Sequence, residues 1–260
     1  MKRLTNNNGF TLIELITVMV ILGVVASFST SFVVSIMRSA VTVNEQNQLL
    51  TNSQLTTGYM VRRLRNALPF SLRITNDESC LQFMPIVSSG LYLNALPSDA
   101  NGAFAGGSFS PIVVSPFIVK GGQADFLAIS ASGSDELYGV APSSLAAIDS
   151  ITTNTITLVD DKRWLRNSIN QRFYIVESPS AFCLVSNELR LYRRVGIENV
   201  LVNSTNDYDL LTLSVGQLNN TFTLSSAIED RNIRITLSLI FSAGQHQIDT
   251  VKQVVMRNVP

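Results

Sequence analysis

Residues 10–37 read FTLIELITVMVILGVVASFSTSFVVSIM, an almost uniformly apolar run in which Glu14 is the one ionisable side chain. A helix of about 20 apolar residues crosses the hydrocarbon core of a bilayer, so this run is long enough to span a membrane. Lys2 and Arg3 precede the run and favour a cytoplasmic start, although Arg38 directly after it weakens that bias. The sequence therefore predicts a single-pass segment whose remaining residues emerge on the far side of the membrane.

Glu14 is unusual in such a run. A carboxylate at the centre of a bilayer costs about 2.5 to 3.5 kcal/mol on insertion scales, and less near the interface. One interpretation is that Glu14 lies at the level of the headgroups and is merely tolerated there. The other is functional, because an ionisable residue inside a membrane segment is a candidate site that needs a partner.

The residues around Glu14 resemble a known processing signal. GFTLIE at residues 9–14, preceded by a short basic leader, is similar to the motif of type IV prepilins and of type II secretion pseudopilins. This resemblance implies that a prepilin peptidase removes residues 1–9 by cutting between Gly9 and Phe10, and that the new amine of Phe10 is then N-methylated. It also implies that Glu14 pairs with the N-terminal amine of a neighbouring subunit in a filament, where one unpaired buried charge would be costly.

Two other interpretations of the N-terminus remain. An ordinary secretory signal peptide would be cut after the apolar run, near Ala26 or Ser27, and would have no use for Glu14. A plain membrane anchor would not be cut at all. Within the resemblance, the presence of Glu14 argues against the outermost position in a tip complex, because the subunit that caps such complexes often lacks this carboxylate.

The sequence after the apolar run predicts that the helix continues into a soluble domain. Residues 38–68 are polar but compatible with a helix, and their apolar side chains recur every three to five residues. These side chains are Leu55, Tyr59 or Met60, Leu64 and Leu68. Pro69 is the expected stop. We expect one long helix, with residues 10–37 in the membrane or filament core and 38–68 packed on the head; two helices broken near Ser39 are the alternative.

Residues 69–260 change to a period of two, which is typical of strands. The strand-like runs are LRIT, CLQFMPIV, ITLV, RFYIVES, AFCLVS, LRLYRRV, YDLLTLSV, TFTLSSAI and NIRITLSLIFS. No second amphipathic helix of useful length follows Pro69. The predicted fold is therefore α+β and pilin-like, with one long N-terminal helix packed on a large antiparallel β head.

Hairpins and loops of the head are also expected from its turn residues. Residues 181–195 are expected to form one hairpin, and 233–241 with 247–256 a second. Residues 94–110 and 131–144 are rich in Gly, Ser and Ala, and we expect both to be long surface loops.

Cys80 and Cys183 are the two cysteines, and they stand about a hundred residues apart. This separation is unlike the CxxC pairs of zinc and thioredoxin-type sites. In an exported domain a disulfide is the simplest interpretation, and on the chain-entropy model it would stabilise the fold by roughly 4 to 5 kcal/mol. In a cytosolic domain both would be buried thiols. The choice depends on the N-terminus, and an exported head favours the disulfide.

Charge and histidine content give little support to a nucleic-acid surface or an active site. The chain carries 19 basic and 19 acidic residues, and its one basic cluster, Arg62, Arg63 and Arg65, is expected to be a solvated helix face. The single histidine, His246, lies in SAGQHQ at an expected hairpin turn. It is a poor candidate for a catalytic base, and one histidine cannot form a paired-histidine metal site.

Carboxylates elsewhere are weak candidates for chemistry. Asp160, Asp161 and Glu177 could serve a hydrolase or a calcium site, but Asp-Asp-Lys more often marks a turn, and the DxDxDG calcium pattern is absent. Trp164 is most simply a packing residue. We therefore predict no enzyme, no metal site and no cofactor.

Three further segments resemble a narrower group. RNALP at 65–69, CLQFMP at 80–85 and VMRNVP at 255–260 are similar to a minor pilin of the mannose-sensitive haemagglutinin (MSHA) pilus, and the layout is also similar to J-type minor pseudopilins. A head of residues 69–260 is large for a major pilin. The resemblance implies a minor pilin that helps prime assembly near the filament tip. A type II secretion pseudopilin and a pilus adhesin that uses loop 94–110 are the alternatives.

The same resemblance implies partners and a location. The partners would be other major and minor pilins, the prepilin peptidase and an inner-membrane assembly platform. Before assembly the head would lie in the periplasm of a Gram-negative bacterium, and after assembly the subunit would be part of a pilus on the cell surface.

Overall fold

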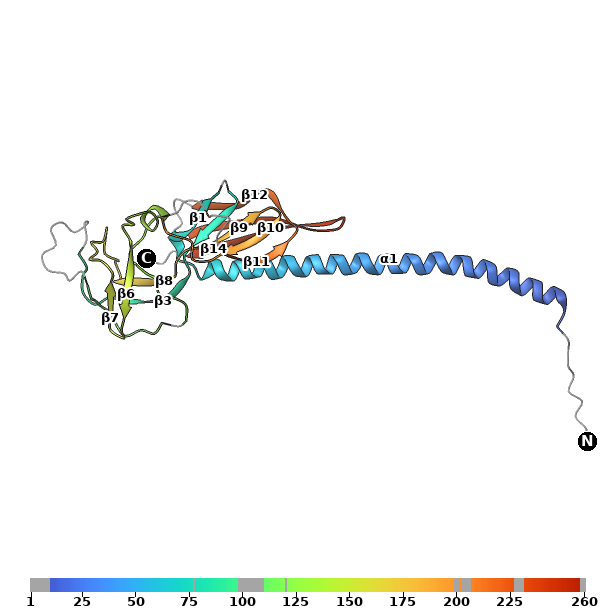
Figure 1. The fold of residues 1–260 in the computed structure, drawn as a ribbon, viewed down its shortest axis with the longest axis horizontal. Helices are drawn as coiled ribbons and strands as arrows, with labels where there is room; N and C mark the ends of the chain where they lie inside the picture. The colour runs from blue at the N-terminus through green and yellow to red at the C-terminus, as the bar shows by residue number, and fades with distance from the viewer. Residues whose placement is uncertain are drawn as a thin grey trace, which may run out of the picture. The chain divides into compact units, whose positions relative to one another are not determined.

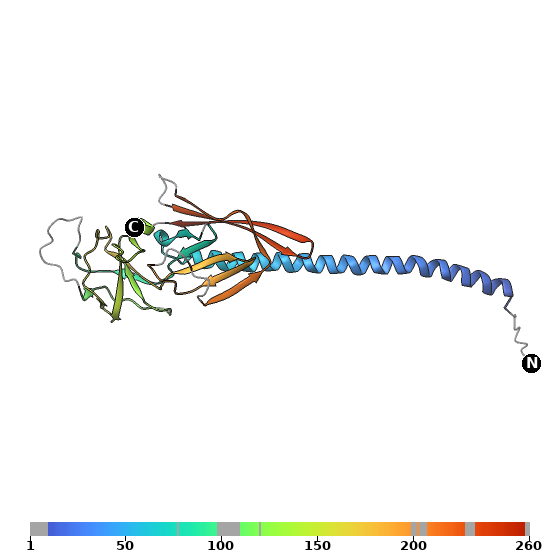
Figure 2. The ribbon, with the colours of Figure 1, turned by 45° about the horizontal axis from the view of Figure 1, so that its top comes forward.

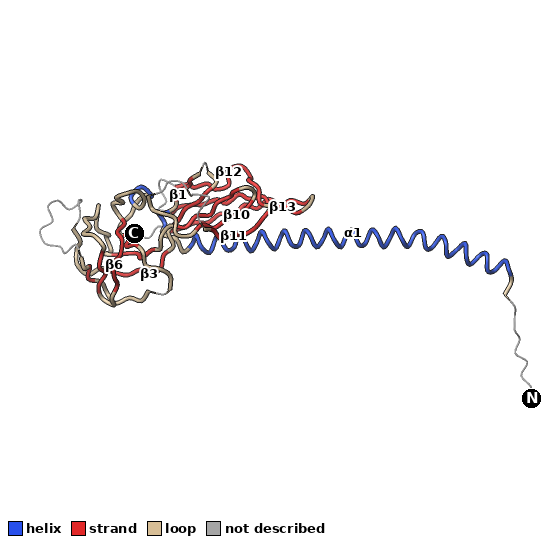
Figure 3. The backbone as a smooth tube through the Cα atoms, viewed as in Figure 1, coloured by secondary structure: helices blue, strands red, loops and turns tan. Residues whose placement is uncertain are grey.

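A computed structural model describes residues 10–76, 78–97, 110–119, 121–198, 202, 207–226 and 232–257. The chain forms two compact units, Met1–Gln48 and Leu49–Pro260. One helix contributes to both units, and the strands belong to the second (Figure 3). The α+β, pilin-like architecture predicted from the sequence is confirmed.

Helix α1 spans Leu12–Arg65 without a break, as predicted (Figure 1). It ends slightly before the expected stop at Pro69. Leu68 takes an extended conformation, with φ −63° and ψ 123°, because the ring of a following proline disfavours the helical region. The chain leaves the helix in a tighter turn, in which the Ala67 amide donates to the Leu64 carbonyl at 3.0 Å. A short 3-10 helix, Pro69–Ser71, follows.

A five-stranded antiparallel sheet follows the helix. Its strands, in spatial order, are β1 (Arg73–Thr75), β2 (Cys80–Phe83), β9 (Ser180–Val185), β10 (Glu188–Tyr192) and β11 (Tyr208–Leu213). Ser186 and Asn187 join β9 to β10 with φ of 50° and 64°. A two-residue turn with positive φ at both positions matches the twist of a hairpin, so the expected hairpin at 181–195 is confirmed.

A second, three-stranded sheet is made of long neighbouring strands (Figure 2). They are β12 (Val215–Ser226), β13 (Asn232–Ala243) and β14 (His246–Arg257), paired in that order. Gly244, with φ 58°, lies in the turn between β13 and β14. The second expected hairpin is thus confirmed, and His246 is the first residue of its second strand.

The last turns of α1 share one hydrophobic core with these two sheets. Met60 and Leu64 are fully buried there, together with Phe83 and Phe182, whose rings stack at 5.1 Å. The expected apolar stripe is wrong at Leu55, which is 66% exposed. The buried side chains lie on a face of the helix that excludes Leu55, and they include small polar residues. Its members are Leu49, Ser53, Thr56, Thr57, Met60 and Leu64.

The residues between β2 and β9 in the sequence form a six-stranded antiparallel sheet. Its strands, in spatial order, are β3 (Ile86–Leu91), β8 (Arg172–Val176), β5 (Phe126–Ala128), β6 (Leu145–Ile151), β7 (Thr155–Leu158) and β4 (Ile112–Val113). The residues after β3 also pair with those around β4, through a Tyr92–Val114 bridge. The Leu93 amide donates to the Val113 carbonyl at 2.9 Å. The ladder therefore returns to its first strand and forms a small barrel.

This barrel has its own core and is an insertion in the five-stranded sheet. Tyr92, Trp164, Phe173 and Ile175 are among its fully buried side chains, so the packing role expected for Trp164 is confirmed. The barrel leaves the sheet after β2 and rejoins it at β9, and these two strands pair directly. The head therefore holds two β structures, where the sequence predicted only one large antiparallel head.

The structure describes all of one expected surface loop and only the ends of the other. Residues 131–144 contain no strand, and only the short 3-10 helix Ser134–Glu136, but they are not simply a surface loop. Leu137, Tyr138 and Ser144 are buried, because the segment packs between the barrel and the 3-10 helix that follows α1. Of residues 94–110, positions 98–109 lie outside the described residues.

Candidate processing and assembly site

The start of α1 places the predicted site residues at an exposed helix end. The Thr11 carbonyl accepts the amides of Glu14 at 3.1 Å and of Leu15 at 3.3 Å, so the first turn begins just after Phe10. Phe10 is 74% exposed, and Glu14 is exposed in the first turn. The positive end of the helix dipole favours a carboxylate at this position. Gly9, the other half of the predicted cleavage site, lies outside the described residues.

The run of residues 10–37 presents apolar side chains on every side of the helix, because each of its residues is exposed. Several of its hydroxyl groups donate to carbonyls one turn earlier in the same helix, at 2.8 to 3.0 Å. These hydroxyls belong to Thr17, Ser27, Ser29, Thr30 and Ser31. Such bonds remove most of the cost of placing a hydroxyl in an apolar medium.

The carboxylate of Glu14 differs from those hydroxyls. It makes no hydrogen bond and no ion pair with any residue that the structure describes, and it is the one charge in residues 10–37. By length and composition α1 can cross a membrane, with a mean hydropathy of 2.3 over its most apolar window. In lipid or in a dry helix bundle an unpaired carboxylate is costly, so Glu14 is a candidate for pairing with a group of another molecule.

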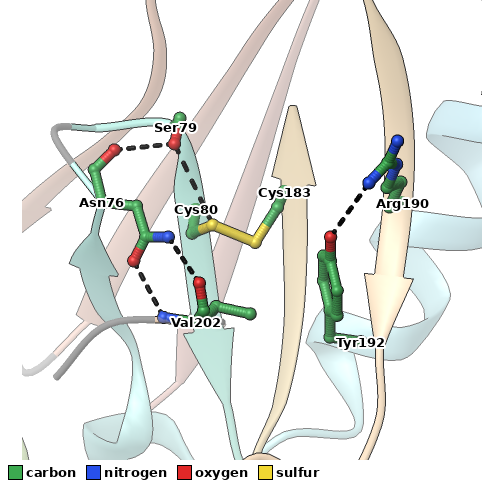
Figure 4. The surroundings of a disulfide bond; sticks show 7 residues. All are labelled: Asn76, Ser79, Cys80, Cys183, Arg190, Tyr192 and Val202. Atoms are coloured by element: carbon green, nitrogen blue, oxygen red, sulfur yellow. Dashed lines mark hydrogen bonds between the residues drawn. A yellow bond between two sulfur atoms is a disulfide. The ribbon is translucent and has the colours of Figure 1, made fainter. Parts of the chain in front are cut away.

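A disulfide joins Cys80 and Cys183 in the middle of the five-stranded sheet (Figure 4). The register of β2 and β9 places the two residues directly opposite each other, and both are fully buried. Asn76, in the turn before β2, binds both backbone groups of Val202 at 2.9 Å. The two cysteines are 103 residues apart in sequence, so the disulfide closes the base of the inserted barrel. Buried thiols, the alternative considered for a cytosolic domain, are not what the structure contains.

One buried carboxylate was not singled out from the sequence. Glu136 accepts hydrogen bonds from Arg166 at 2.7 and 3.0 Å, from the amide and hydroxyl of Ser132, and from the Ser144 hydroxyl at 2.9 Å. Burial alone would raise the pKa of Glu136, but these hydrogen bonds outweigh it and lower the pKa to about 2. This network fixes the segment 131–144 against the barrel.

The other acidic candidates do not form a site together. Asp160 and Asp161 are exposed after β7, as expected for a turn. Glu177 follows β8 and accepts the Gln123 amide at 3.3 Å. In the described ranges, no three His, Cys, Asp or Glu side chains are grouped so that they could hold a metal ion.

The basic cluster at the end of α1 is solvated only in part. Arg62 and Arg65 are exposed, as expected. Arg63 is half-buried, because its guanidinium lies 5.5 Å from the centre of the Tyr59 ring and its Nε donates to the Tyr59 hydroxyl at 3.1 Å. The expectation of a wholly solvated face is therefore wrong for Arg63.

Comparison with known proteins finds a match at the N-terminal end of the chain, which contains Glu14. A family model described as the prokaryotic N-terminal methylation motif matches residues 4–30. The match supports a type IV pilin-like prepilin, the class to which both pilus subunits and pseudopilins belong. This motif is structural and implies processing by a prepilin peptidase at a membrane and assembly with other pilins. No curated protein and no solved structure matches the chain.

Proposed function

We propose that the chain is a minor type IV pilin that enters a filament near its tip and helps to start its assembly. The observation that carries the proposal is the Glu14 carboxylate. It is the one charge in the exposed apolar residues 10–37, and it has no partner in the described part of its own chain. An apolar helix that leaves lipid for a dry filament core must have this charge neutralised there.

The N-terminal amine of a neighbouring subunit is the partner that fits best. A peptidase cut between Gly9 and Phe10 creates a positively charged amine at the start of the helix, and this amine would then be N-methylated and keep its charge. Pairing of this amine with Glu14 of the next subunit neutralises two charges at once and fixes the axial register of the two helices. The match at residues 4–30 supports the cut and the methylation that create this amine.

The head supports a minor rather than a major subunit. Besides the sheets that pack on α1, it carries an inserted barrel with a separate core, which makes it large for a subunit that is repeated along a filament. The segments at 65–69, 80–85 and 255–260 favour the MSHA type. We place the head in the periplasm of a Gram-negative bacterium before assembly and on the cell surface afterwards, with other pilins and the inner-membrane platform as partners.

The test compares Glu14→Ala and Glu14→Gln with Ser35→Ala, a control substitution in the same apolar run. We expect both Glu14 variants to lose residues 1–9 normally, as measured by intact mass. Both should be depleted at least tenfold from purified filaments, since an unpaired buried amine costs more than about 1.4 kcal/mol. The control should be cut and incorporated normally. Normal incorporation of both Glu14 variants would contradict the proposed role.

A clean deletion of the gene separates a pilus from a secretion system. The proposal predicts fewer surface filaments, with unchanged export of secreted hydrolases. Normal filaments with blocked export would instead assign the chain to a type II secretion system.

A further inference from the structure

Two charges bracket the apolar part of α1. Glu14 lies near its start and Arg38 lies directly after it, and the 23 residues between them, 15–37, are all uncharged. Arg38 is exposed and, like Glu14, makes no hydrogen bond and no ion pair with any residue that the structure describes. α1 is an unbroken helix over this stretch, so the two charges are held at a fixed separation along its axis.

That separation matches the thickness of a membrane. At 1.5 Å per residue, 23 residues extend roughly 35 Å, and the hydrocarbon core of a bilayer is about 30 Å thick. A helix tilt of about 30° takes up the difference, and such a tilt is within the range that membrane helices adopt. Both charges can therefore lie at headgroup level at the same time, Glu14 on the cytoplasmic face and Arg38 on the far face.

Apolar side chains alone would not fix the depth of this helix. No charge separates Arg38 from Glu45, and Val41 and Val43 are 58% and 54% exposed. Without a charge at position 38, the uncharged stretch would be residues 15–43, or about 43 Å, which is too long to be matched by a usual tilt. The helix could then take up several depths that differ by up to about 9 Å. Arg38 is the residue that removes this freedom.

A lipid phosphate is the partner that fits Arg38. The long aliphatic part of an arginine side chain can stay against apolar surface while the guanidinium reaches the headgroup layer. A guanidinium can donate two parallel hydrogen bonds to a phosphate, and it is always charged. Positive residues are usually concentrated on the cytoplasmic side of a membrane, so the rule for orientation does not explain an arginine on the far face.

We propose that Arg38 binds the phosphate of phospholipid headgroups on the far face of the membrane and thereby fixes the depth of α1 before assembly. Phe10 precedes Glu14 by four residues, so this depth holds the Gly9–Phe10 bond close to the cytoplasmic face, where a membrane-bound peptidase would cut it. Arg38 is then a positioning residue for the cut. This inference rests on the proposed function, since it presupposes a prepilin in a membrane.

The depth of the helix can be measured with a single reporter thiol. The two cysteines of the chain form a buried disulfide, so a cysteine that replaces Val43 is the one free thiol. The purified full chain is reconstituted in nanodiscs of phosphatidylethanolamine and phosphatidylglycerol, which contain no other membrane protein, and its reaction with a charged maleimide is timed. The unsubstituted Arg38 protein is compared with Arg38→Lys, Arg38→Leu and Ser39→Leu. Ser39→Leu is the matched control, because it adds the same apolar side chain and keeps the charge.

We expect Arg38→Leu to slow the labelling of position 43 by at least about fivefold, because this position enters the hydrocarbon when the helix slides. Arg38→Lys and Ser39→Leu should react at the rate of the Arg38 protein. A cysteine at Asn47, which lies beyond the charge of Glu45, should react equally in all four proteins. An unchanged rate at position 43 in Arg38→Leu, a slow rate there in Arg38→Lys or Ser39→Leu, or unequal rates at position 47 would overturn the proposal.

Removal of residues 1–9 in cells tests the positioning role. In pulse-labelled cells that contain the peptidase, the cut should be about threefold slower in Arg38→Leu, because the Gly9–Phe10 bond is displaced from the membrane face, and unchanged in Arg38→Lys and Ser39→Leu. An unchanged rate in Arg38→Leu would contradict the positioning role. If the unsubstituted chain keeps residues 1–9 although the peptidase is present, the proposed function fails instead, and the labelling in nanodiscs still decides whether Arg38 fixes the depth.

Discussion

Two glutamates in this chain lie where an unpaired carboxylate would be costly, and they differ in whether their own chain supplies hydrogen-bond and ion-pair partners. Glu136 is buried, and Arg166, Ser132 and Ser144 of its own chain satisfy it. Glu14 lies in an apolar helix and has no partner in the described part of its own chain. The first arrangement is that of a structural group, whereas the proposed function gives the second a partner on another molecule.

Only one of these glutamates could be predicted from the sequence. Glu14 is identified by its immediate neighbours, because the contrast between a carboxylate and an apolar run is local. Glu136 depends on Arg166, 30 residues away, and on Ser144, eight residues away. Nothing in the Gly- and Ser-rich segment around Glu136 indicates that the fold brings these groups together.

Glu136 should make the head sensitive to acid. Because its pKa falls from 4.5 to about 2 on folding, the network contributes stability that is fully present above pH 4.5 and is lost as the pH falls toward 2. The contribution is at most about 3 kcal/mol. In Glu136→Gln we expect a less stable protein at pH 7 and a flatter pH dependence of the unfolding free energy between pH 4.5 and 2.

This prediction is measured on the full chain in detergent micelles. Trp164 is the single tryptophan, and its burial in the barrel core makes its fluorescence a probe of unfolding. Asp149→Asn, at an exposed position of β6, is the control. A pH dependence that is unchanged in Glu136→Gln would show that another carboxylate is responsible.

At the scale of elements, the long helix and most strands follow from local patterns. The period of two identifies the strands that pack on α1, and Pro69 places the end of the helix to within a few residues. Strands β4 and β5 have only two and three residues, too few to show a period. The closure of the barrel could not be predicted, because it depends on pairing between distant segments such as Tyr92 and Val114.

The orientation of α1 on the head can be tested with two leucines of the same helix. Leu64 is fully buried in the shared core, whereas Leu55 is 66% exposed. We expect Leu64→Ala to lower the unfolding free energy by about 2 to 5 kcal/mol and Leu55→Ala to change it by less than about 0.5 kcal/mol. Denaturant unfolding of the full chain in micelles measures both. Equal effects would mean that the helix packs through a different face.

At the scale of the whole molecule, the Cys80–Cys183 disulfide closes the point at which the barrel is inserted. It links two strands that are adjacent in the sheet but 103 residues apart in the chain. The sequence could suggest this pairing only through the expected export of the head. It could not reveal that the loop so closed contains a separate barrel, which is a property of the long-range topology.

Loss of this disulfide should destabilise the protein without changing its topology. We expect the double variant Cys80→Ala, Cys183→Ala to lose about 2 to 5 kcal/mol of unfolding free energy. A reducing agent should destabilise the unsubstituted chain by a similar amount and leave the double variant unaffected. Sensitivity of the double variant to the reductant would contradict the assignment.

If the chain is a prepilin cut between Gly9 and Phe10, as proposed, the N-terminus of the mature protein is Phe10, and determining this N-terminus is the most direct test. The measurement is the intact mass and N-terminal sequence of the protein isolated from membranes of cells with and without the prepilin peptidase. We predict a chain that begins at N-methylated Phe10 when the peptidase is present and at Met1 when it is absent. A chain that retains residues 1–9 in both strains, or that begins near Ala26 or Ser27, would contradict the claim.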